Sequence, residues 1–258
     1  MEAKVKFKRR LLWLIFLTAG AVIVTFTLQP VPQSAAYHDF ADKRRLLGVP
    51  NCLNVITNLA FLITGIIGLL QLNKSSGGSK LNIIYTFLFS GIFLTGLGSG
   101  YYHWHPDNNT LVFDRIPMTI VFMSLLSATV AESIDLKMGS ILLFPLLLVG
   151  TGSVLLWHYT ELRGAGDLRL YGLVQFYPVL FIPFILLAFP SATPVNNGWR
   201  QLALAVVWYI TAKFCERYDQ QIYAVTHLIS GHSLKHLAAA ISTWYLVELF
   251  MKKHVDAV

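Results

Sequence analysis

Residues 81–102 read LNIIYTFLFSGIFLTGLGSGYY, a run of apolar and small side chains without a lysine, arginine, aspartate or glutamate. A helix of roughly 20 such residues is long enough to cross the hydrocarbon core of a bilayer. Seven more runs of this kind occur along the chain, at about residues 11–29, 53–72, 114–132, 138–157, 171–190, 199–215 and 233–251. The sequence therefore predicts eight membrane-spanning helices.

The composition agrees with a membrane protein. Of the 258 residues, 55% are hydrophobic and 13% are charged, and the mean hydropathy is +0.58, which is too apolar for an ordinary soluble domain. The ten-residue alternation of apolar and polar positions that marks a membrane β-barrel does not recur. We therefore predict an all-α, polytopic membrane helix bundle. Basic patches interleaved with aromatic residues on a soluble surface are absent, so we expect no nucleic-acid partner.

The first apolar run differs from the others because a basic cluster precedes it. The cluster comprises Lys4, Lys6, Lys8, Arg9 and Arg10. Such a cluster predicts a cytoplasmic N-terminus. A cleaved signal peptide ending near residues 34–36 is an alternative, but the apolar run is longer than the usual seven to fifteen residues. We favour an uncleaved signal-anchor helix and linker at residues 1–36, followed by a seven-helix domain at residues 37–258.

Polar and ionisable side chains gather at the predicted helix ends. Ser99 and His103 end one run, Asp114 opens the next, and His232 and His236 open the last. Residues four apart share a helix face, so three imidazoles could converge. Zinc commonly takes histidine nitrogens, and a catalytic zinc site leaves one position open for water. Ionisable groups at membrane depth are functional candidates, and the pattern therefore predicts a metal site.

The histidines are distributed unevenly between the two sides of the predicted bundle. With alternating helices, seven of the eight lie on or beside the side opposite the N-terminus, and His254 is the exception. The predicted site therefore lies toward the outer or luminal leaflet, where a lipid headgroup could reach it.

Three motifs occur in a fixed order: Ser99-x3-His103, Asp114-x-x-Pro117-Met118 and Gly231-His232-x3-His236. Together they resemble the alkaline ceramidase family. That family belongs to a superfamily of seven-helix membrane proteins that also includes the adiponectin receptors and GPI-remodelling proteins. The similarity covers the chain from about Tyr37 to Lys253, which leaves the first helix as an addition.

The resemblance implies a zinc-dependent hydrolase that cleaves the amide of ceramide-like N-acyl lipids taken from the bilayer. Zinc would be held by His103, His232 and His236, and Ser99 and Asp114 would face the metal-bound water. Zinc lowers the pKa of bound water to about 7. Asp114 would act as general base and then acid, and Ser99 would donate a hydrogen bond to the developing oxyanion.

The same residues could instead have purely structural roles. Asp114 could be a helix N-cap, and Ser99, between two glycines, could merely permit close helix packing. His105 competes with His103, although the Ser-x3-His spacing favours His103. The alternative functions are a non-catalytic zinc-containing receptor or structural protein, a hydrolase of another lipid amide or ester, and an ion transporter that uses Asp114 and the histidines as a relay.

The loop before the second run departs from the family pattern. In ceramidases the matching stretch begins Asp-Trp-x-Glu and supplies a calcium site, whereas this chain has Asp39-Phe40-Ala41-Asp42, then Lys43-Arg44-Arg45, and Asn51 where a glutamate is expected. Calcium requires six to eight oxygen ligands, and three adjacent cations oppose it. We therefore do not expect Ca²⁺ here and predict that Asp39 and Asp42 pair with Arg44 or Arg45.

Two further features have structural interpretations. Asp167 and Arg169 lie in the loop before the sixth run, where they could position a lipid headgroup. The favoured interpretation is that they cap a helix or pair with each other. Cys52 and Cys215 fall near helix ends on the same side, so a disulfide is conceivable in an oxidising compartment. Two buried free thiols are the favoured interpretation.

Overall fold

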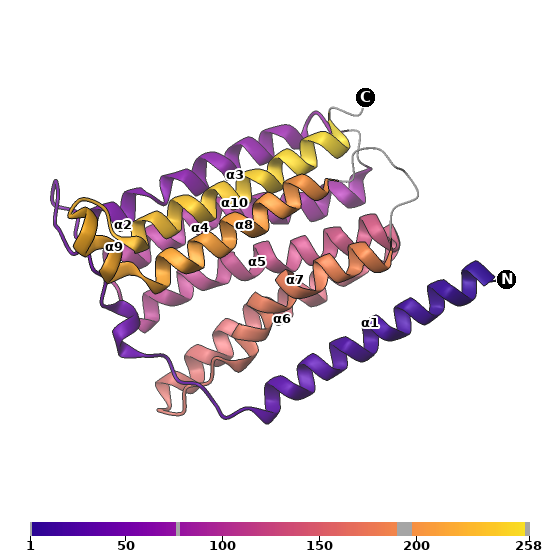
Figure 1. Cartoon of the computed structure of the whole chain (residues 1–258), viewed down its shortest axis with the longest axis horizontal. Coiled ribbons are helices and arrows are strands. Elements are labelled where there is room, and N and C mark those ends of the chain that lie inside the picture. Colours follow the sequence, from indigo (N-terminus) through magenta and orange to yellow (C-terminus); the bar gives the residue numbers. More distant parts are fainter. Residues whose placement is uncertain (1, 76–77, 190–197, 256–258) are drawn as a thin grey trace. The chain divides into compact units, whose positions relative to one another are not determined.

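The computed structural model describes residues 2–75, 78–189 and 198–255. Within these ranges the secondary structure is helical, apart from an isolated β-bridge between Leu46 and Val49. The predicted all-α class is therefore confirmed. The helices, most of them labelled in Figure 1, are α1 (Glu2–Thr27), η1 (Ala35–His38), α2 (Cys52–Ile56), α3 (Leu59–Leu72), α4 (Ser79–Trp104), α5 (Asn108–Ser133), α6 (Leu136–Leu162), α7 (Arg169–Ala188), α8 (Trp199–Arg217), α9 (Asp219–Thr226) and α10 (Gly231–His254).

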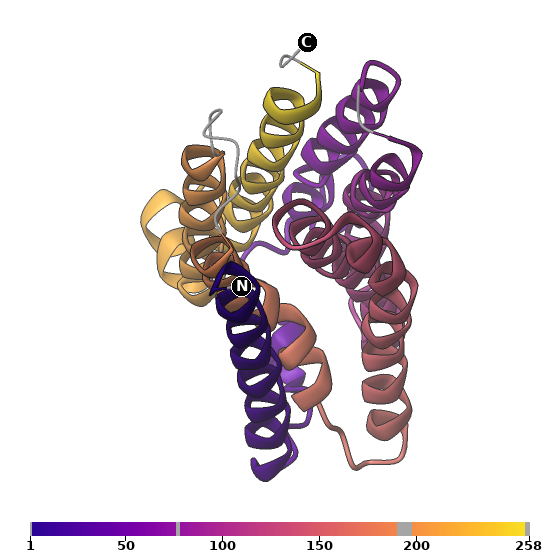
Figure 2. The ribbon, with the colours of Figure 1, turned by 90° about the vertical axis from the view of Figure 1, so that its right-hand side faces the viewer.

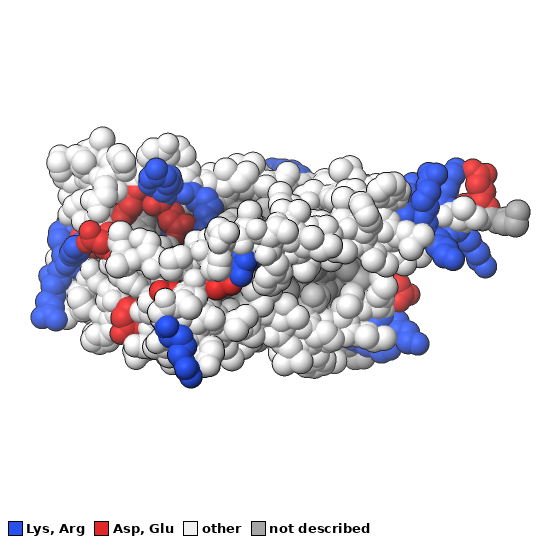
Figure 3. Space-filling model, turned by 90° about the horizontal axis from the view of Figure 1, so that it is seen from below, with Lys and Arg blue, Asp and Glu red and all other residues white. Residues whose placement is uncertain are grey.

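Six of the described helical stretches are long and apolar enough to cross a membrane: α1, α2 with α3, α4, α5, α6 and α7. This is consistent with an integral multi-pass membrane protein. The sequence also predicted spans at α8 and α10, which are helical there but fall outside this set. In α10 the polar residues His232 and His236 lower the hydropathy, yet both are buried within the protein. Large areas of the surface in Figure 3 carry neither acidic nor basic side chains.

The chain forms two compact units. Unit 1 contains the described parts of residues 1–33 and 122–194, and unit 2 contains those of residues 34–121 and 195–258. In unit 1, α7 packs against both α1 and α6. In unit 2, α10 packs along α8 and α3, and α3 packs along α4, as Figure 2 shows.

The loop before α7 confirms one predicted ion pair. The guanidinium of Arg169 donates to both carboxylate oxygens of Asp167, at 2.9 Å from Nε to Oδ1 and 2.8 Å from Nη2 to Oδ2. These hydrogen bonds from Arg169 hold the pKa of Asp167 below its usual value. Arg169 Nη1 also donates to the Leu28 carbonyl at 2.6 Å. The pair therefore fastens the end of the first helix to the start of α7 within unit 1.

The predicted helix at residues 53–72 is interrupted at Thr57 and Asn58, between α2 and α3. Thr57 N donates four residues back, to Leu53 O, at 3.1 Å. The bonds that follow span only three residues, with Asn58 N donating to Val55 O at 3.2 Å and Phe61 N donating to Asn58 O at 3.0 Å. This tighter 3₁₀ pattern within a helix often marks a functional hinge or a strained sequence. Short helix α9 was also not predicted, because its eight residues lie in a segment assigned to a loop.

Helix α5 begins six residues earlier than predicted. Thr110 N donates to Asp107 Oδ1 at 2.7 Å, and Asp107 N donates to Thr110 Oγ1 at 3.1 Å. This reciprocal pair caps the helix start. Asp114 therefore lies inside α5, and its interpretation as an N-cap is wrong.

Candidate metal centre

Three histidines converge at one end of unit 2. His103 lies in the last turn of α4, and His232 and His236 lie in the first turns of α10. Their exposed fractions are 0%, 4% and 2%, and one nitrogen from each lies within 4.8 Å of the other two. The ring centroids are 4.6 to 5.0 Å apart. This histidine cluster is the convergence that the helical spacing predicted.

The start of α10 is fixed by side chains that accept its unpaired amide groups. Ser230 is the N-cap and its Oγ accepts from Ser233 N at 3.1 Å. Asp219 Oδ1 accepts from His232 N at 2.7 Å. A Cβ at Gly231 would collide with the Cys215 carbonyl oxygen, so glycine lets α10 start against the end of α8. Because the helix begins here, His232 and His236 share the face turned toward α4.

A close approach of α4 to α5 places Ser99 and Asp114 together. A Cβ at Gly98 would collide with the Phe113 carbonyl oxygen. Pro117 has no N–H to offer that oxygen, which leaves the carbonyl accessible to the neighbouring helix. Both Ser99 and Asp114 are buried, and their side chains are neighbours. Asp114 does not belong to the histidine cluster. Its neighbour Ser99 lies in α4, one turn before His103.

The free nitrogens of His103 and His236 fit a metal ion. Thr57 Oγ1 donates to the Leu53 carbonyl at 2.7 Å, so its lone pairs accept from His236 Nδ1–H at 3.0 Å. That bond leaves the lone pair on His236 Nε2, which has no hydrogen-bond partner among the described residues. Neither ring nitrogen of His103 has such a partner. Buried imidazole nitrogens normally find a partner, and a hydrogen bond to the second nitrogen is typical of metal-ligating histidines.

Two buried asparagines, Asn51 just before α2 and Asn54 within it, connect the two histidine-bearing helices. Asn51 Nδ2 donates to the His103 carbonyl at 2.9 Å, at the end of α4. Asn54 Oδ1 accepts from Ser233 Oγ at 2.6 Å, at the start of α10. Asn51 occupies a position where the family has a glutamate of its calcium site. Here the amide groups of Asn51 and Asn54 instead help to position the histidines.

The loop at residues 39–42 covers the histidine cluster. The buried ring of Phe40 lies 4.7 Å from that of His103 and 4.6 Å from that of His232, measured between centroids. Ala41 N donates to Asp219 Oδ2 at 2.9 Å, which ties this loop to the residue that caps α10. An aromatic side chain at this place excludes water from one side of the cluster.

The acidic residues of this loop are paired with bases. Arg44 contacts Asp42 through Nε at 2.8 Å and Nη2 at 2.7 Å, which confirms one predicted ion pair. Burial disfavours the Asp42 carboxylate, but the hydrogen bonds from Arg44 outweigh it and hold the pKa of Asp42 below its usual value. Asp39 pairs with Lys43, so the prediction that it pairs with an arginine is wrong. Lys43 follows Asp39 by four residues and reaches it directly.

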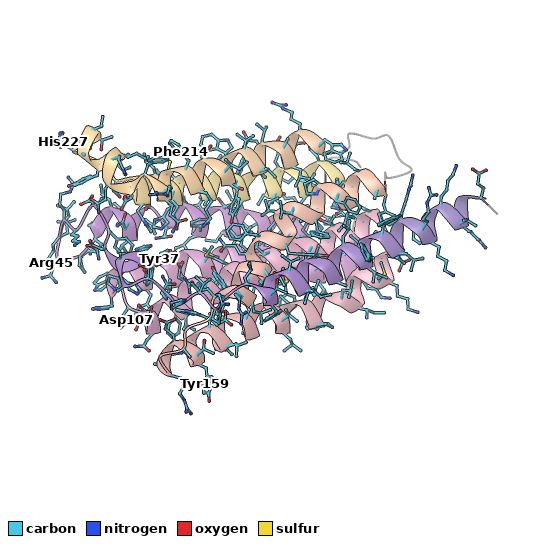
Figure 4. The ribbon with its side chains drawn as sticks, turned by 60° about the horizontal axis from the view of Figure 1, so that its bottom comes forward. Tyr37, Arg45, Asp107, Tyr159, Phe214 and His227 are labelled. Atoms are coloured by element: carbon cyan, nitrogen blue, oxygen red, sulfur yellow. The ribbon has the colours of Figure 1, made fainter. Side chains whose placement is uncertain are left out.

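The other histidines of this region do not belong to the cluster. His105 follows α4 and is exposed, which decides between it and His103. His38 bonds the Tyr102 hydroxyl at 2.9 Å and Asn108 Oδ1 at 3.0 Å. Figure 4 labels four residues of unit 2 that lie toward one end of its helices: Tyr37, Arg45, Asp107 and His227.

Cys52 and Cys215 are both buried free thiols.

Sequence reasoning missed a group of charges beside the histidine cluster. Glu216 Oε1 contacts Lys235 Nζ at 2.8 Å, and Glu216 Oε2 contacts Lys213 Nζ at 2.8 Å. Lys235 Nζ also lies 3.3 Å from His232 Nε2. The guanidinium of Arg115 lies over the ring of Tyr37, 5.6 Å from its centroid. The sequence did offer one indication of this group. Lys235 is a charged residue three positions after His232 in a chain poor in charges.

A family model for ceramidases matches residues 49–256, which include all three histidines, Ser99 and Asp114. None of the curated proteins compared with the chain matches it. The matched region covers most of the chain and contains the whole histidine cluster. The chain belongs to the ceramidase family.

Proposed function

We propose that this protein is a zinc-dependent membrane hydrolase that cleaves the amide bond of ceramide-like N-acyl lipids. The observation that carries the proposal is the buried histidine cluster inside the region matched by the ceramidase family. His103, His232 and His236 would hold the metal. When bound, zinc would lower the pKa of a water molecule and polarise the carbonyl under attack.

Asp114 is the proton carrier in this proposal. Its carboxylate takes a proton from the attacking water as the new carbon–oxygen bond forms. It then returns the proton to the nitrogen as the carbon–nitrogen bond breaks, so that a fatty acid and an amine leave. The burial of Asp114 keeps bulk water from competing for that proton.

Ser99 orients Asp114 and assists the carbonyl oxygen. Its side chain is a neighbour of the Asp114 carboxyl, to which its hydroxyl would donate. Rotation of that hydroxyl toward the substrate would supply a hydrogen bond to the developing oxyanion and free a carboxylate oxygen to accept the proton. The same groups are suited to an ester, so ester lipids belong in any substrate screen.

Metal analysis combined with a product screen tests the proposal. The purified protein is expected to hold about one zinc per chain, since three histidines form one site. The variants His232→Ala and His236→Ala are expected to lose the metal and hydrolysis, whereas His105→Ala, which alters an exposed histidine outside the cluster, is expected to keep both. The screen covers ceramides, other N-acyl lipids, ester lipids and phospholipids. Full metal retention in both alanine variants would contradict the ligand assignment, and no cleavage of any N-acyl lipid would contradict the function.

A further inference from the structure

Beside the histidine cluster, one carboxylate is shared by two lysines. Glu216 bonds Lys235 with one oxygen and Lys213 with the other, both at 2.8 Å. The side chains of Lys235, Glu216 and Lys213 are 16%, 20% and 37% exposed. A single carboxylate compensates only one of the two ammonium charges, so this lysine pair keeps an excess of positive charge in a partly buried place.

The lysine pair lies next to the proposed reaction centre. Lys235 Nζ is 3.3 Å from His232 Nε2, and the Tyr37 hydroxyl is 3.5 Å from Glu216 Oε1. Arg115, buried over the ring of Tyr37, adds a third cation to this side of the site. Asp114 and Glu216 are the acidic side chains whose charges act on Lys235. Three cations therefore face two acids beside the histidines.

Lys235 has a donor to spare for a ligand. An ammonium group has three N–H donors, and those of Lys235 have two neighbours, Glu216 Oε1 and His232 Nε2. One N–H of Lys235 therefore remains for a ligand. Glu216 holds the ammonium beside His232, where this N–H can reach a ligand in the site.

We propose that Lys213 and Lys235, held by Glu216, form an anion subsite that binds an acidic group, a phosphate or a carboxylate, on the head of the lipid whose amide is cleaved. This proposal rests on the proposed function and specifies its substrate class. The excess positive charge favours an acidic head over a neutral one, since charge-assisted hydrogen bonds are the stronger kind. The preferred substrate is therefore an N-acyl lipid with a negatively charged head.

A binding experiment tests the subsite without relying on turnover. Dodecyl phosphate is expected to raise the thermal unfolding temperature of the purified protein, and dodecanol, which has the same chain without the charge, is not. The variants Lys235→Met and Lys213→Met should each lose that shift while keeping their zinc. Lys252→Met is the matched control, because Lys252 is also a part-exposed lysine paired with a glutamate, Glu248. A shift that survives in both subsite variants would overturn the proposal.

A kinetic comparison tests the same subsite in catalysis. Ceramide and the same ceramide with a phosphate on its primary hydroxyl differ only in head charge. The unaltered protein is expected to favour the phosphorylated lipid by about tenfold in kcat/KM. Lys213→Met is expected to abolish that preference by raising KM for the phosphorylated lipid. Equal losses on both lipids would show a merely structural role and overturn the proposal. If no N-acyl lipid is cleaved while the lysine-dependent dodecyl phosphate shift remains, the subsite stands and the proposed function fails.

Discussion

The orientation of the His236 ring depends on a hydrogen bond to its second nitrogen. His236 Nδ1–H is held by Thr57, whose hydroxyl is itself committed to the Leu53 carbonyl. A ligand nitrogen fixed in this way needs no reorganisation when a metal binds, which strengthens binding. The Thr57 side chain, at the break between α2 and α3, is therefore expected to contribute to metal binding by orienting His236.

We expect Thr57→Val to weaken zinc affinity by about 10- to 100-fold, because the His236 N–H would lose its acceptor and the ring could rotate. Competition with a fluorescent zinc chelator measures the affinity. Thr64→Val is the control, since Thr64 makes the same kind of bond to the carbonyl four residues earlier, at 2.9 Å, without contacting a histidine. Equal zinc affinity in both variants would remove Thr57 from the site.

Asp114 gives the second prediction at the scale of a residue. Asp114→Asn is expected to keep zinc and to lose about 10²- to 10⁴-fold in kcat, because the amide cannot accept the proton from water. Asp107→Asn, at the cap that precedes the same helix, is the control, since asparagine is an equally good helix cap. Zinc analysis with an amide-cleavage assay distinguishes the two, and an Asp114→Asn protein of parental activity would rule out the proton-carrier role.

At the scale of elements, the approach of α4 to α5 depends on the absence of a side chain at Gly98. We expect Gly98→Ala to destabilise the protein by about 1–3 kcal/mol or more, because the obstacle is the Phe113 carbonyl in the backbone and cannot move aside. Gly100→Ala, two residues later in the same helix, meets no atom within 4 Å and should be neutral or slightly stabilising. Thermal unfolding of both variants in detergent provides the comparison, and equal unfolding temperatures would contradict the packing argument.

The start of α10 gives a second prediction at this scale. Asp219→Ala removes the acceptor for the amides of His232 and Ala41. We expect a loss of about 1 kcal/mol in stability, as for other helix caps, and weaker zinc binding because His232 and the Phe40 loop are both released. Asp135→Ala removes the cap of α6, a 2.8 Å bond from Met138 N, and should cost similar stability without changing zinc affinity. If both variants bind zinc equally, Asp219 is only a cap.

At the scale of the whole molecule, the orientation in the membrane remains our prediction from the basic N-terminal cluster, with the N-terminus cytoplasmic and the site toward the outer or luminal side. The division into a signal-anchor segment at residues 1–36 and a ceramidase-like domain at residues 37–258 is likewise a prediction. Leu47, fully exposed at the tip of the loop before α2, and Lys8, exposed in α1, offer probes for the two sides.

We expect a membrane-impermeant thiol reagent to label Leu47→Cys in intact cells and to label Lys8→Cys only after the membrane is opened. Cys52 and Cys215 are buried and should not react in the folded protein, so the unaltered chain serves as the background. The reverse pattern of labelling would show the opposite orientation in the membrane and contradict the prediction. Detection of an N-terminal epitope tag on the mature protein separately tests whether the first helix is retained.

The sequence by itself determined the membrane class, the positions of the long helices and the three histidines, because apolar runs and i, i+4 spacing are local properties of the chain. It could not reveal the break at Thr57, the start of α5 or the commitment of Asp39 to Lys43, which depend on side-chain bonds competing with the regular pattern. Only the tertiary structure decided that Glu216 and Lys235 adjoin His232. These residues come from α8 and α10, and packing between helices, which no local pattern encodes, brings their charges together.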